Sequence, residues 1–258
     1  MTTKGIGKLS AVVLVSALTA APPLNAQQSA KVSANFNGVW MTPGRTQLRN
    51  PESEWTTEKL PFTPKGREVF EANRPSRGPR RLTTHLELEN DPMRGANPPG
   101  LYRTLVYSRP IEFLQTPEKL VQLFAWGKIW RTIYTDGRPV PDDVPAGPYW
   151  YGYSVGKWEG NTLVATTVGL DERAWFDDWG VPISGEARVE ERWQPLGPDK
   201  LQLTITVHDP ITYSKPWTSS PVIFLRQRDV EPKEIILAPI DEATFNEHLR
   251  IPAITAPK

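Results

Sequence analysis

The stretches Ile133-Tyr-Thr-Asp-Gly-Arg138, Tyr151-Gly-Tyr-Ser-Val-Gly-Lys-Trp-Glu-Gly-Asn-Thr-Leu163 and Glu190-Glu-Arg-Trp193 decide the fold class of this chain. Within them apolar and polar residues alternate, and Asp-Gly and Glu-Gly-Asn turns join the segments, which is the pattern of strands and hairpins. The 27 prolines cluster between these segments, as sheet pairing requires. Many short strands with this spacing predict a barrel or a sandwich.

The same alternation extends over most of the chain and predicts ten further strands after a first one at residues 36–41. A helix is expected at residues 63–73, where Thr63 can cap it and Pro64 suits the first helical position. Residues 74–100 hold many Arg, Pro and Gly and are interpreted as a long covering loop. The expected strands are 102–108, 110–115, 119–126, 128–135, 150–158, 161–168, 186–194, 200–208, 221–229 and 233–237.

Gly38-Val-Trp40, on the first predicted strand, resembles the Gly-x-Trp start of lipocalin-like (calycin) barrels. In those barrels an Arg of a late strand often packs on the Trp, and Arg226 or Arg228 is the expected partner here. Together with the strand pattern, this predicts an all-β fold: an antiparallel, calycin-like β-barrel of about eight to ten strands with one short helix and a long covering loop.

The N-terminus has the three-part pattern of a secretory signal peptide, with Lys4 and Lys8, an apolar run at residues 9–21 and a small residue at Ala26. The apolar run is shorter than the roughly 20 residues that span a bilayer, so no membrane span is expected. We expect a cleaved signal peptide at 1–26, a flexible leader at 27–35, one barrel domain at 36–240 and a C-terminal tail at 241–258. The predicted location is periplasmic or secreted.

Composition removes several classes of function. The 258 residues include 30 basic and 29 acidic side chains, a net charge of +1 that gives no general attraction to nucleic acid. Because there is no Cys, a thiol nucleophile, an iron–sulfur cluster and a Cys-ligated zinc are excluded. No pair among the three His has metal-ligand spacing. We therefore expect no cofactor and no metal, although calcium in the acidic segment 171–178 and a homo-oligomer stay open.

Half of the chain resembles a family of exported, mostly uncharacterised proteins of soil bacteria. The matching strings are Tyr134-Thr-Asp-Gly-Arg138, Gly152-Tyr-Ser-Val-Gly-Lys-Trp-Glu-Gly-Asn-Thr-Leu163, Glu191-Arg-Trp193, and Asp209-Pro210 with Pro216-Trp217. Two frequent His residues of the family are Tyr153 and Ile183 here, and its usual Cys are absent. If those His carry the family's chemistry, this chain does something else, and the resemblance implies no secure reaction.

Glu191 is the first candidate for chemistry. Alternate residues of a strand share a face, so Glu191 shares one with Ala187, Val189 and Trp193, which are apolar. A lone carboxylate there acts as a general acid or base if it is unpaired, or forms a buried salt bridge, for example to Arg131. Both interpretations stay open. Arg131 is itself a candidate clamp for a carboxylate or phenolate.

Further candidates supply hydroxyls, a second acid and a base. Tyr134 and Tyr153 can donate to an oxyanion. Asp177 is the favoured acid of the segment 171–180, and His208, followed by Asp209, is a potential base at a barrel mouth. Packing is the ordinary alternative for aromatic residues, but their number suggests that a flat ligand stacks among some of the 10 Trp. The expected substrate-binding residues are Trp126, Trp130, Trp150, Trp175 and Trp217.

Two functions of different class follow. The first is an exported, cofactor-independent enzyme of the lyase, dehydratase or isomerase type, acting on a small aromatic molecule such as a lignin-derived compound by acid–base chemistry. The second is a non-catalytic, lipocalin-like binding protein for such a molecule. A purely structural module, with Glu191 locked in a salt bridge, is the third alternative.

Overall fold

The computed structural model describes Met1 and Thr2 and residues 34–43, 52–81, 88–95, 97–142, 144, 147 and 149–235. The predicted signal peptide (apart from its first two residues), most of the leader and the predicted C-terminal tail lie outside the described residues. The chain divides into two units, Met1–Ala30 and Lys31–Lys258, and every element below belongs to the second. Within the described ranges, no helix has both the length and the apolar character that crossing a membrane requires.

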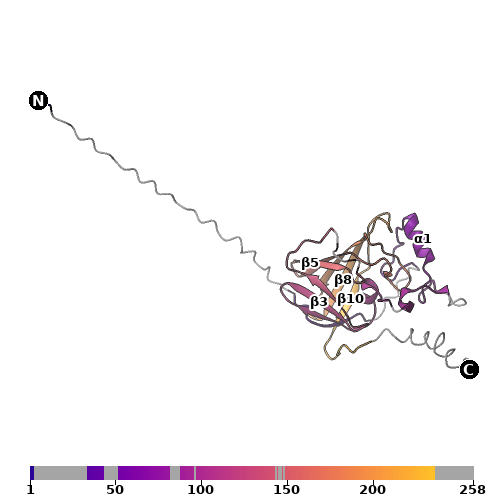
Figure 1. The fold of residues 1–258 in the computed structure, drawn as a ribbon. Helices are drawn as coiled ribbons and strands as arrows, with labels where there is room; N and C mark the ends of the chain where they lie inside the picture. Colours follow the sequence, from indigo (N-terminus) through magenta and orange to yellow (C-terminus); the bar gives the residue numbers. More distant parts are fainter. Residues whose placement is uncertain are drawn as a thin grey trace, which may run out of the picture. The chain divides into compact units, whose positions relative to one another are not determined.

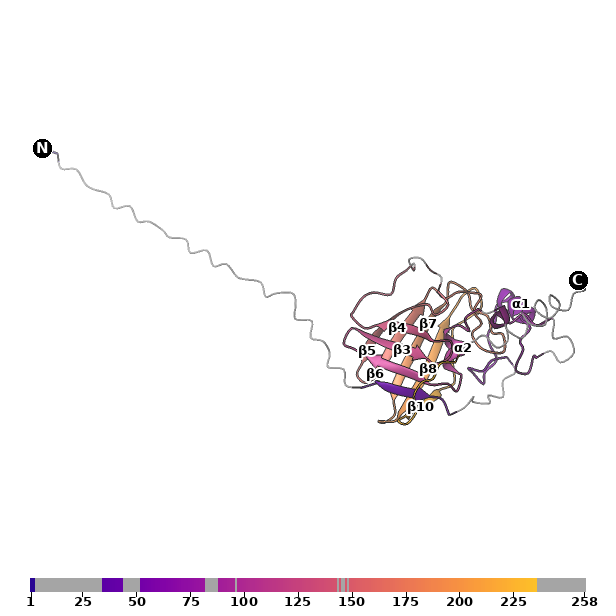
Figure 2. The ribbon, with the colours of Figure 1, turned by 60° about the horizontal axis from the view of Figure 1, so that its bottom comes forward.

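Nine strands close a β-barrel, seen from two directions in Figures 1 and 2. Neighbours in sequence are neighbours in the wall from β1 to β8, and β10 closes the circle by pairing with β8 on one side and β1 on the other. The all-β, calycin-like fold is confirmed. The strands are β1 (Gly38–Met41), β2 (Ile111–Gln115), β3 (Lys119–Phe124), β4 (Ile129–Tyr134), β5 (Tyr153–Glu159), β6 (Thr162–Val168), β7 (Arg188–Pro195), β8 (Lys200–His208) and β10 (Val222–Gln227), with β9 (Trp217–Thr218) added to the far end of β8.

The expectation of a wholly antiparallel barrel is wrong at one place. β4 and β5 are parallel, and their register joins Ile133 to Ser154 and Tyr134 to Val155. The Asp136-Gly137 turn does not fold the chain back as a hairpin. Residues 135–152 instead form the long connection that a parallel pair needs. The Glu159-Gly-Asn161 turn joins an antiparallel hairpin, as predicted, and the turn at residues 196–199 joins another.

The helices differ in part from expectation. α1 (Pro64–Ala72) is confirmed, with the Thr63 hydroxyl accepting from the Gly66 amide and proline in the first turn. Residues 102–108 are not a strand, because α2 (Leu101–Leu105) occupies this position and packs into the core. A 3-10 turn, η2 (Pro92–Gly95), precedes it. The predicted strand 233–237 is reduced to a bridge between Ile235 and Trp126, and its last two residues lie outside the described part.

Aromatic side chains fill the barrel interior by packing on one another. Phe113 contacts Trp193 edge-on with ring centroids 5.4 Å apart, and Trp193 lies 5.2 Å from Phe224. Trp40 lies 6.4 Å from Phe113. All four are buried. In an interior packed in this way the aromatic rings contact one another, which is the ordinary role of aromatic side chains in a core.

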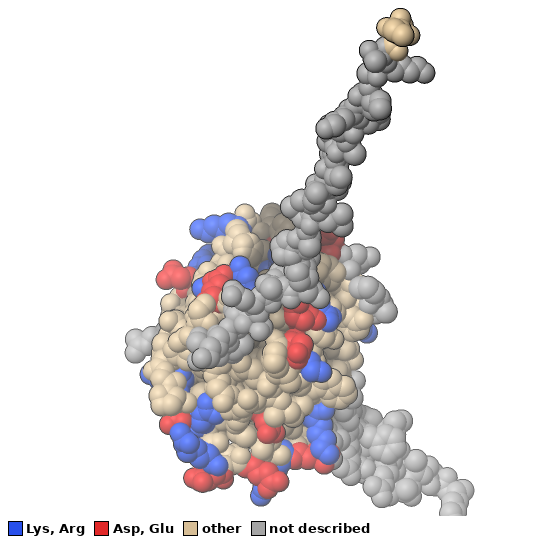
Figure 3. Space-filling model, turned by 90° about the vertical axis from the view of Figure 1, so that its left-hand side faces the viewer, with Lys and Arg blue, Asp and Glu red and all other residues tan. Residues whose placement is uncertain are grey.

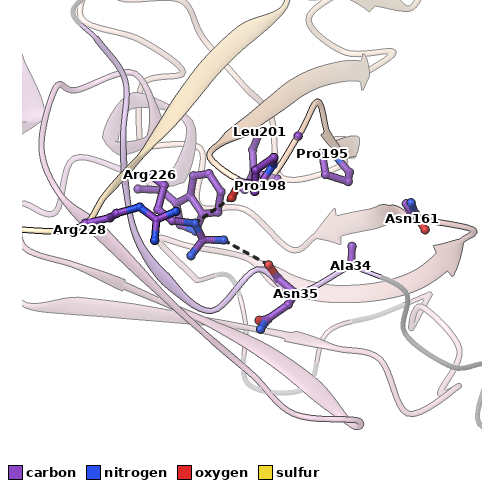
Figure 4. Close-up of a pocket in the computed structure, with 10 residues that line it drawn as sticks. Ala34, Asn35, Asn161, Pro195, Pro198, Leu201, Arg226 and Arg228 are labelled. Atoms are coloured by element: carbon purple, nitrogen blue, oxygen red, sulfur yellow. Dashed lines mark hydrogen bonds between the residues drawn. The ribbon is translucent and has the colours of Figure 1, made fainter.

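The predicted stacking of a late-strand arginine on Trp40 is confirmed, because the guanidinium of Arg226 lies 4.2 Å from the ring centroid. The guanidinium also donates to the carbonyls of Asn35 and Pro198, as Figure 4 shows. Gly38 is required beside it, because a Cβ at this position would lie 2.6 Å from Nη1 of Arg226. A pocket of about 540 Å³ lies outside this stack.

The surface carries charges of both signs. On the face shown in Figure 3, blue Lys and Arg side chains alternate with red Asp and Glu side chains, and no continuous patch of one sign is visible. Ion pairs are found among the exposed residues, such as Arg192 with Glu159 at 3.0 Å. Such pairs are screened by solvent and contribute little to stability.

Candidate functional site

The carboxylate of Glu191 is paired with the guanidinium of Arg131 inside the barrel. Nη1 and Nη2 of Arg131 donate to the two carboxylate oxygens over 2.8 and 2.6 Å. Both side chains are essentially inaccessible to solvent. The face predicted for β7 is also correct, since Ala187, Val189, Glu191 and Trp193 are all buried. Of the two interpretations of Glu191, the buried salt bridge is the one that the structure contains.

The pair is completed by a closed set of hydrogen bonds. Tyr102 of α2 donates its hydroxyl to Glu191 over 3.1 Å, and Trp193 donates its indole N–H over 3.0 Å. The remaining N–H groups of Arg131 are used as well, because they donate to Ser154 (2.9 Å), Gln122 (3.1 Å) and Thr167 (2.6 Å). Buried ions persist when their remaining donors and acceptors are satisfied in this way.

The hydroxyl of Tyr102 remains a hydrogen-bond donor. Burial, followed by the negative charge of Glu191, raises the pKa of this phenol well above its ordinary value. Protonated Tyr102 and charged Arg131 therefore both point donors at Glu191. A general acid or base has to reach the proton that it transfers, and Glu191 has no solvent-accessible surface.

A groove opens in the barrel wall where β4 and β5 separate. Their pairing spans only Ile133–Tyr134 and Ser154–Val155, and residues 149–152 precede β5 and line one space with residues of β4. Tyr149 is tied there to the end of β6, since its amide donates to the Gly169 carbonyl over 2.9 Å. The groove measures about 530 Å³. Its lining residues are Trp130, Arg131, Thr132, Tyr134, Tyr149, Trp150, Tyr151, Gly152, Tyr153 and Ser154.

Six of these ten lining residues are aromatic, and four of the six were predicted as site residues. Trp130 is 67% exposed, although it has a side chain that ordinarily is buried. It points outward because it alternates with the inward Ile129 and Arg131. The rings of Tyr134 and Tyr153 lie 5.5 Å apart and are inclined by 30°. The groove therefore offers several aromatic faces to one space.

Two arginines stack on the aromatic residues of this groove. The guanidinium of Arg138 lies 3.6 Å from the ring centroid of Tyr134, and that of Arg173 lies 4.8 Å from Trp150. Each arginine is held by an aspartate two residues earlier, Asp136 for Arg138 and Asp171 for Arg173. The hydrogen bonds from Arg138 lower the pKa of Asp136.

Asp177, Trp175 and Trp217 lie away from this groove, in the part of the core formed by the loops. Asp177 is wholly buried and accepts from the amides of Glu54 (2.8 Å) and Trp179 (2.9 Å) and from the Ser53 hydroxyl (3.0 Å). Desolvation raises its pKa to about 6 in spite of these donors. Trp217 packs edge-on against Phe176 at 5.6 Å. These residues attach the segment 171–180 to the segment that begins at Glu52.

A second buried ionic cluster holds α2 to the covering loop. Arg103 donates to both oxygens of Asp91, with Nη1 at 2.8 Å from Oδ1, and its Nε donates to Asp178. Tyr107 donates its hydroxyl to Asp178 over 2.7 Å. Three of the four acids of the segment 171–178, namely Asp171, Asp177 and Asp178, are thus bound to cations or amides. Across the described residues, no group of three or more His, Asp or Glu side chains is placed to hold a metal ion.

His208 and Trp126 also lie apart from the groove. His208 is exposed at the end of β8. The following Asp209 is not oriented as its partner, because this carboxylate accepts from the amide and hydroxyl of Ser184 over 2.8 and 2.7 Å. The ring centroids of Trp126 and Tyr107 lie 5.0 Å apart, and Trp126 forms a bridge with Ile235, the last described residue. The structure therefore divides the predicted site residues among separate places.

Three features were missed from sequence, two of them in or beside the groove. Tyr149 lies in a Pro-rich connection, Tyr151 lies ahead of β5 although the predicted strand 150–158 included it, and the stacking of Arg138 and Arg173 depends on how two distant turns fold. Tyr102 lies 89 positions from its partner Glu191, and no local signal connects them. The Asp-x-Arg spacing shared by residues 136–138 and 171–173 is the one signal that could have indicated the two arginines.

The function of the groove has to be inferred from the residues that line it. Comparisons of the chain with protein-family models, with curated proteins and with solved structures find no match.

Proposed function

We propose that this chain is an exported protein that binds a small planar aromatic molecule in the groove between β4 and β5. The observation that carries the proposal is that six of the ten residues lining one open space of about 530 Å³ are aromatic. Ligand sites in proteins have this size and are lined mainly by apolar and aromatic groups with a few polar ones. Export is supported by the three-part pattern of the N-terminal sequence.

Binding without chemistry is favoured over the acid–base enzyme expected from sequence. The candidate acid or base, Glu191, is 0% exposed and accepts from Arg131, Tyr102 and Trp193. A general base must reach the proton that it abstracts, directly or through one water. The lyase, dehydratase or isomerase hypothesis stays a prediction, and the aromatic groove supports the binding function better.

Isothermal titration with trans-cinnamate and trans-cinnamamide tests this function. Both are planar, and they differ only in the carboxylate and the amide. We expect at least one of them to bind, and Trp130→Ala to weaken binding about tenfold, which corresponds to about 1.4 kcal/mol. Because Trp130 is exposed, this variant leaves the core intact.

Ile211→Ala is the matched control, since Ile211 is an exposed apolar residue outside the groove. It should bind the ligand as the unaltered chain does. Equal affinity of the two variants would place the ligand elsewhere. The absence of binding heat with both compounds and with larger planar aromatics would contradict the proposed function.

A further inference from the structure

Beside the groove, in contact with its lining residues Tyr134 and Tyr153, lies a positively charged side chain that is held in a fixed position. Arg138 stacks on Tyr134 and donates through Nη1 to the hydroxyl of Tyr153 over 2.9 Å. Its Nε and Nη2 donate to Asp136 over 2.9 and 2.6 Å. Because hydrogen bonds through Nε, Nη1 and Nη2 already hold the guanidinium, it loses little further conformational entropy when a ligand binds to the N–H groups that remain.

Three donors remain at this place beside the groove. Arg138 has five N–H groups, and within the described part of the chain three of them are engaged, which leaves one on Nη1 and one on Nη2. The Tyr153 hydroxyl accepts from Arg138, so its own hydrogen is directed to another acceptor. This place beside the groove therefore presents donors and needs a ligand group that accepts.

Arg131, the arginine that sequence suggested as a clamp, cannot take this role. Its five N–H groups are used by Ser154, Gln122, Thr167 and the two oxygens of Glu191. It is also buried beneath the groove. Arg138 is 38% exposed in its side chain and stands beside Tyr134 and Tyr153, which line the groove.

We propose that the ligand is an aromatic carboxylate, with its ring among the aromatic residues of the groove and its carboxylate at Arg138 and Tyr153. A carboxylate has two oxygens that only accept, and it matches both the planar edge of a guanidinium and a phenol hydroxyl. An amide or ester of the same ring has one acceptor oxygen and no charge. This inference rests on the proposed function, because it assigns the chemical class of the ligand of that groove.

The test compares trans-cinnamate with trans-cinnamamide by isothermal titration at pH 7 against three forms of the chain. The unaltered chain should bind the carboxylate at least tenfold more tightly than the amide. Arg138→Gln should lose at least tenfold for the carboxylate and less than twofold for the amide. Tyr153→Phe should lose threefold or more for the carboxylate only.

Arg173→Gln is the matched control, because Arg173 also stacks on an aromatic residue of the groove and is paired with an aspartate. It should change the preference for the carboxylate by less than threefold. Equal affinities for the two compounds, both weakened by Trp130→Ala, would overturn the carboxylate assignment and leave the proposed function standing. Loss of the preference in Arg173→Gln, with Arg138→Gln unaffected, would also overturn it.

Discussion

Replacing Glu191 by Gln should destabilise the fold severely, because it leaves the Arg131 guanidinium buried without its counter-charge. The carboxylate now accepts two bonds from Arg131 and one each from Tyr102 and Trp193, and an amide can replace only one of its two oxygens. Breaking a buried ion pair on one side costs about 3–5 kcal/mol. That is a large part of the roughly 5–15 kcal/mol that stabilises a typical domain.

Guanidinium denaturation followed by Trp fluorescence measures this loss. Arg131→Met should cost a similar amount, since it leaves Glu191 without its counter-charge. The double variant should cost clearly less than the sum of the two single ones, with a coupling of about 2 kcal/mol or more. The exposed pair Arg192–Glu159 provides the matched cycle, with a coupling below about 1 kcal/mol.

Two outcomes would refute this reasoning. One is a Glu191→Gln variant that unfolds within about 1 kcal/mol of the unaltered chain, since breaking a buried ion-pair network is among the changes that cost more than this. The other is a coupling in the Arg131–Glu191 cycle no larger than that of the exposed pair. Either would restore Glu191 as a candidate for catalysis.

Other features of the fold give further expectations. Burial raises the pKa of Asp177 to about 6. The stability that protonation of Asp177 gives the fold is therefore complete below the ordinary pKa of an aspartate, and it is lost as the pH rises through 6. Between pH 4 and pH 7 the unaltered chain should lose on the order of 3 kcal/mol relative to Asp177→Asn, and parallel pH profiles of the two in urea denaturation would contradict this. Gly38→Ala should cost about 1–3 kcal/mol, because its φ of +118° disfavours a side chain and the Cβ would displace Arg226. An unchanged midpoint of thermal unfolding would count against it.

The alternation of apolar and polar residues predicts most of the barrel. Alternation located every strand of the closed barrel, because each has one face in the core and the other toward solvent or loops. The helix at 101–105 was mistaken for a strand, since Tyr102, Thr104 and Val106 favour strands by propensity. The buried pairing of Arg103 with Asp91 and Asp178 overrides that preference. Such long-range contacts leave no trace in the local sequence.

The site was predicted only in its parts. The shared face of β7 correctly placed Glu191 inward, but whether it meets Arg131 depends on the closure of the barrel. The parallel register of β4 and β5 was not predictable from a turn signal that ordinarily marks a hairpin. The groove lies where this short parallel pairing ends, and it brings together Trp130, Trp150 and Tyr149. The alternation of residues within a strand does not predict such an arrangement.

Mapping trans-cinnamate onto the chain by amide chemical-shift changes tests the central claim most directly. If the ligand occupies the groove, the largest changes should fall on the amides of Thr132, Gly152 and Ser154, which line it. Changes concentrated instead at Gly197 and Leu201, beside the pocket of Arg226, would contradict the account.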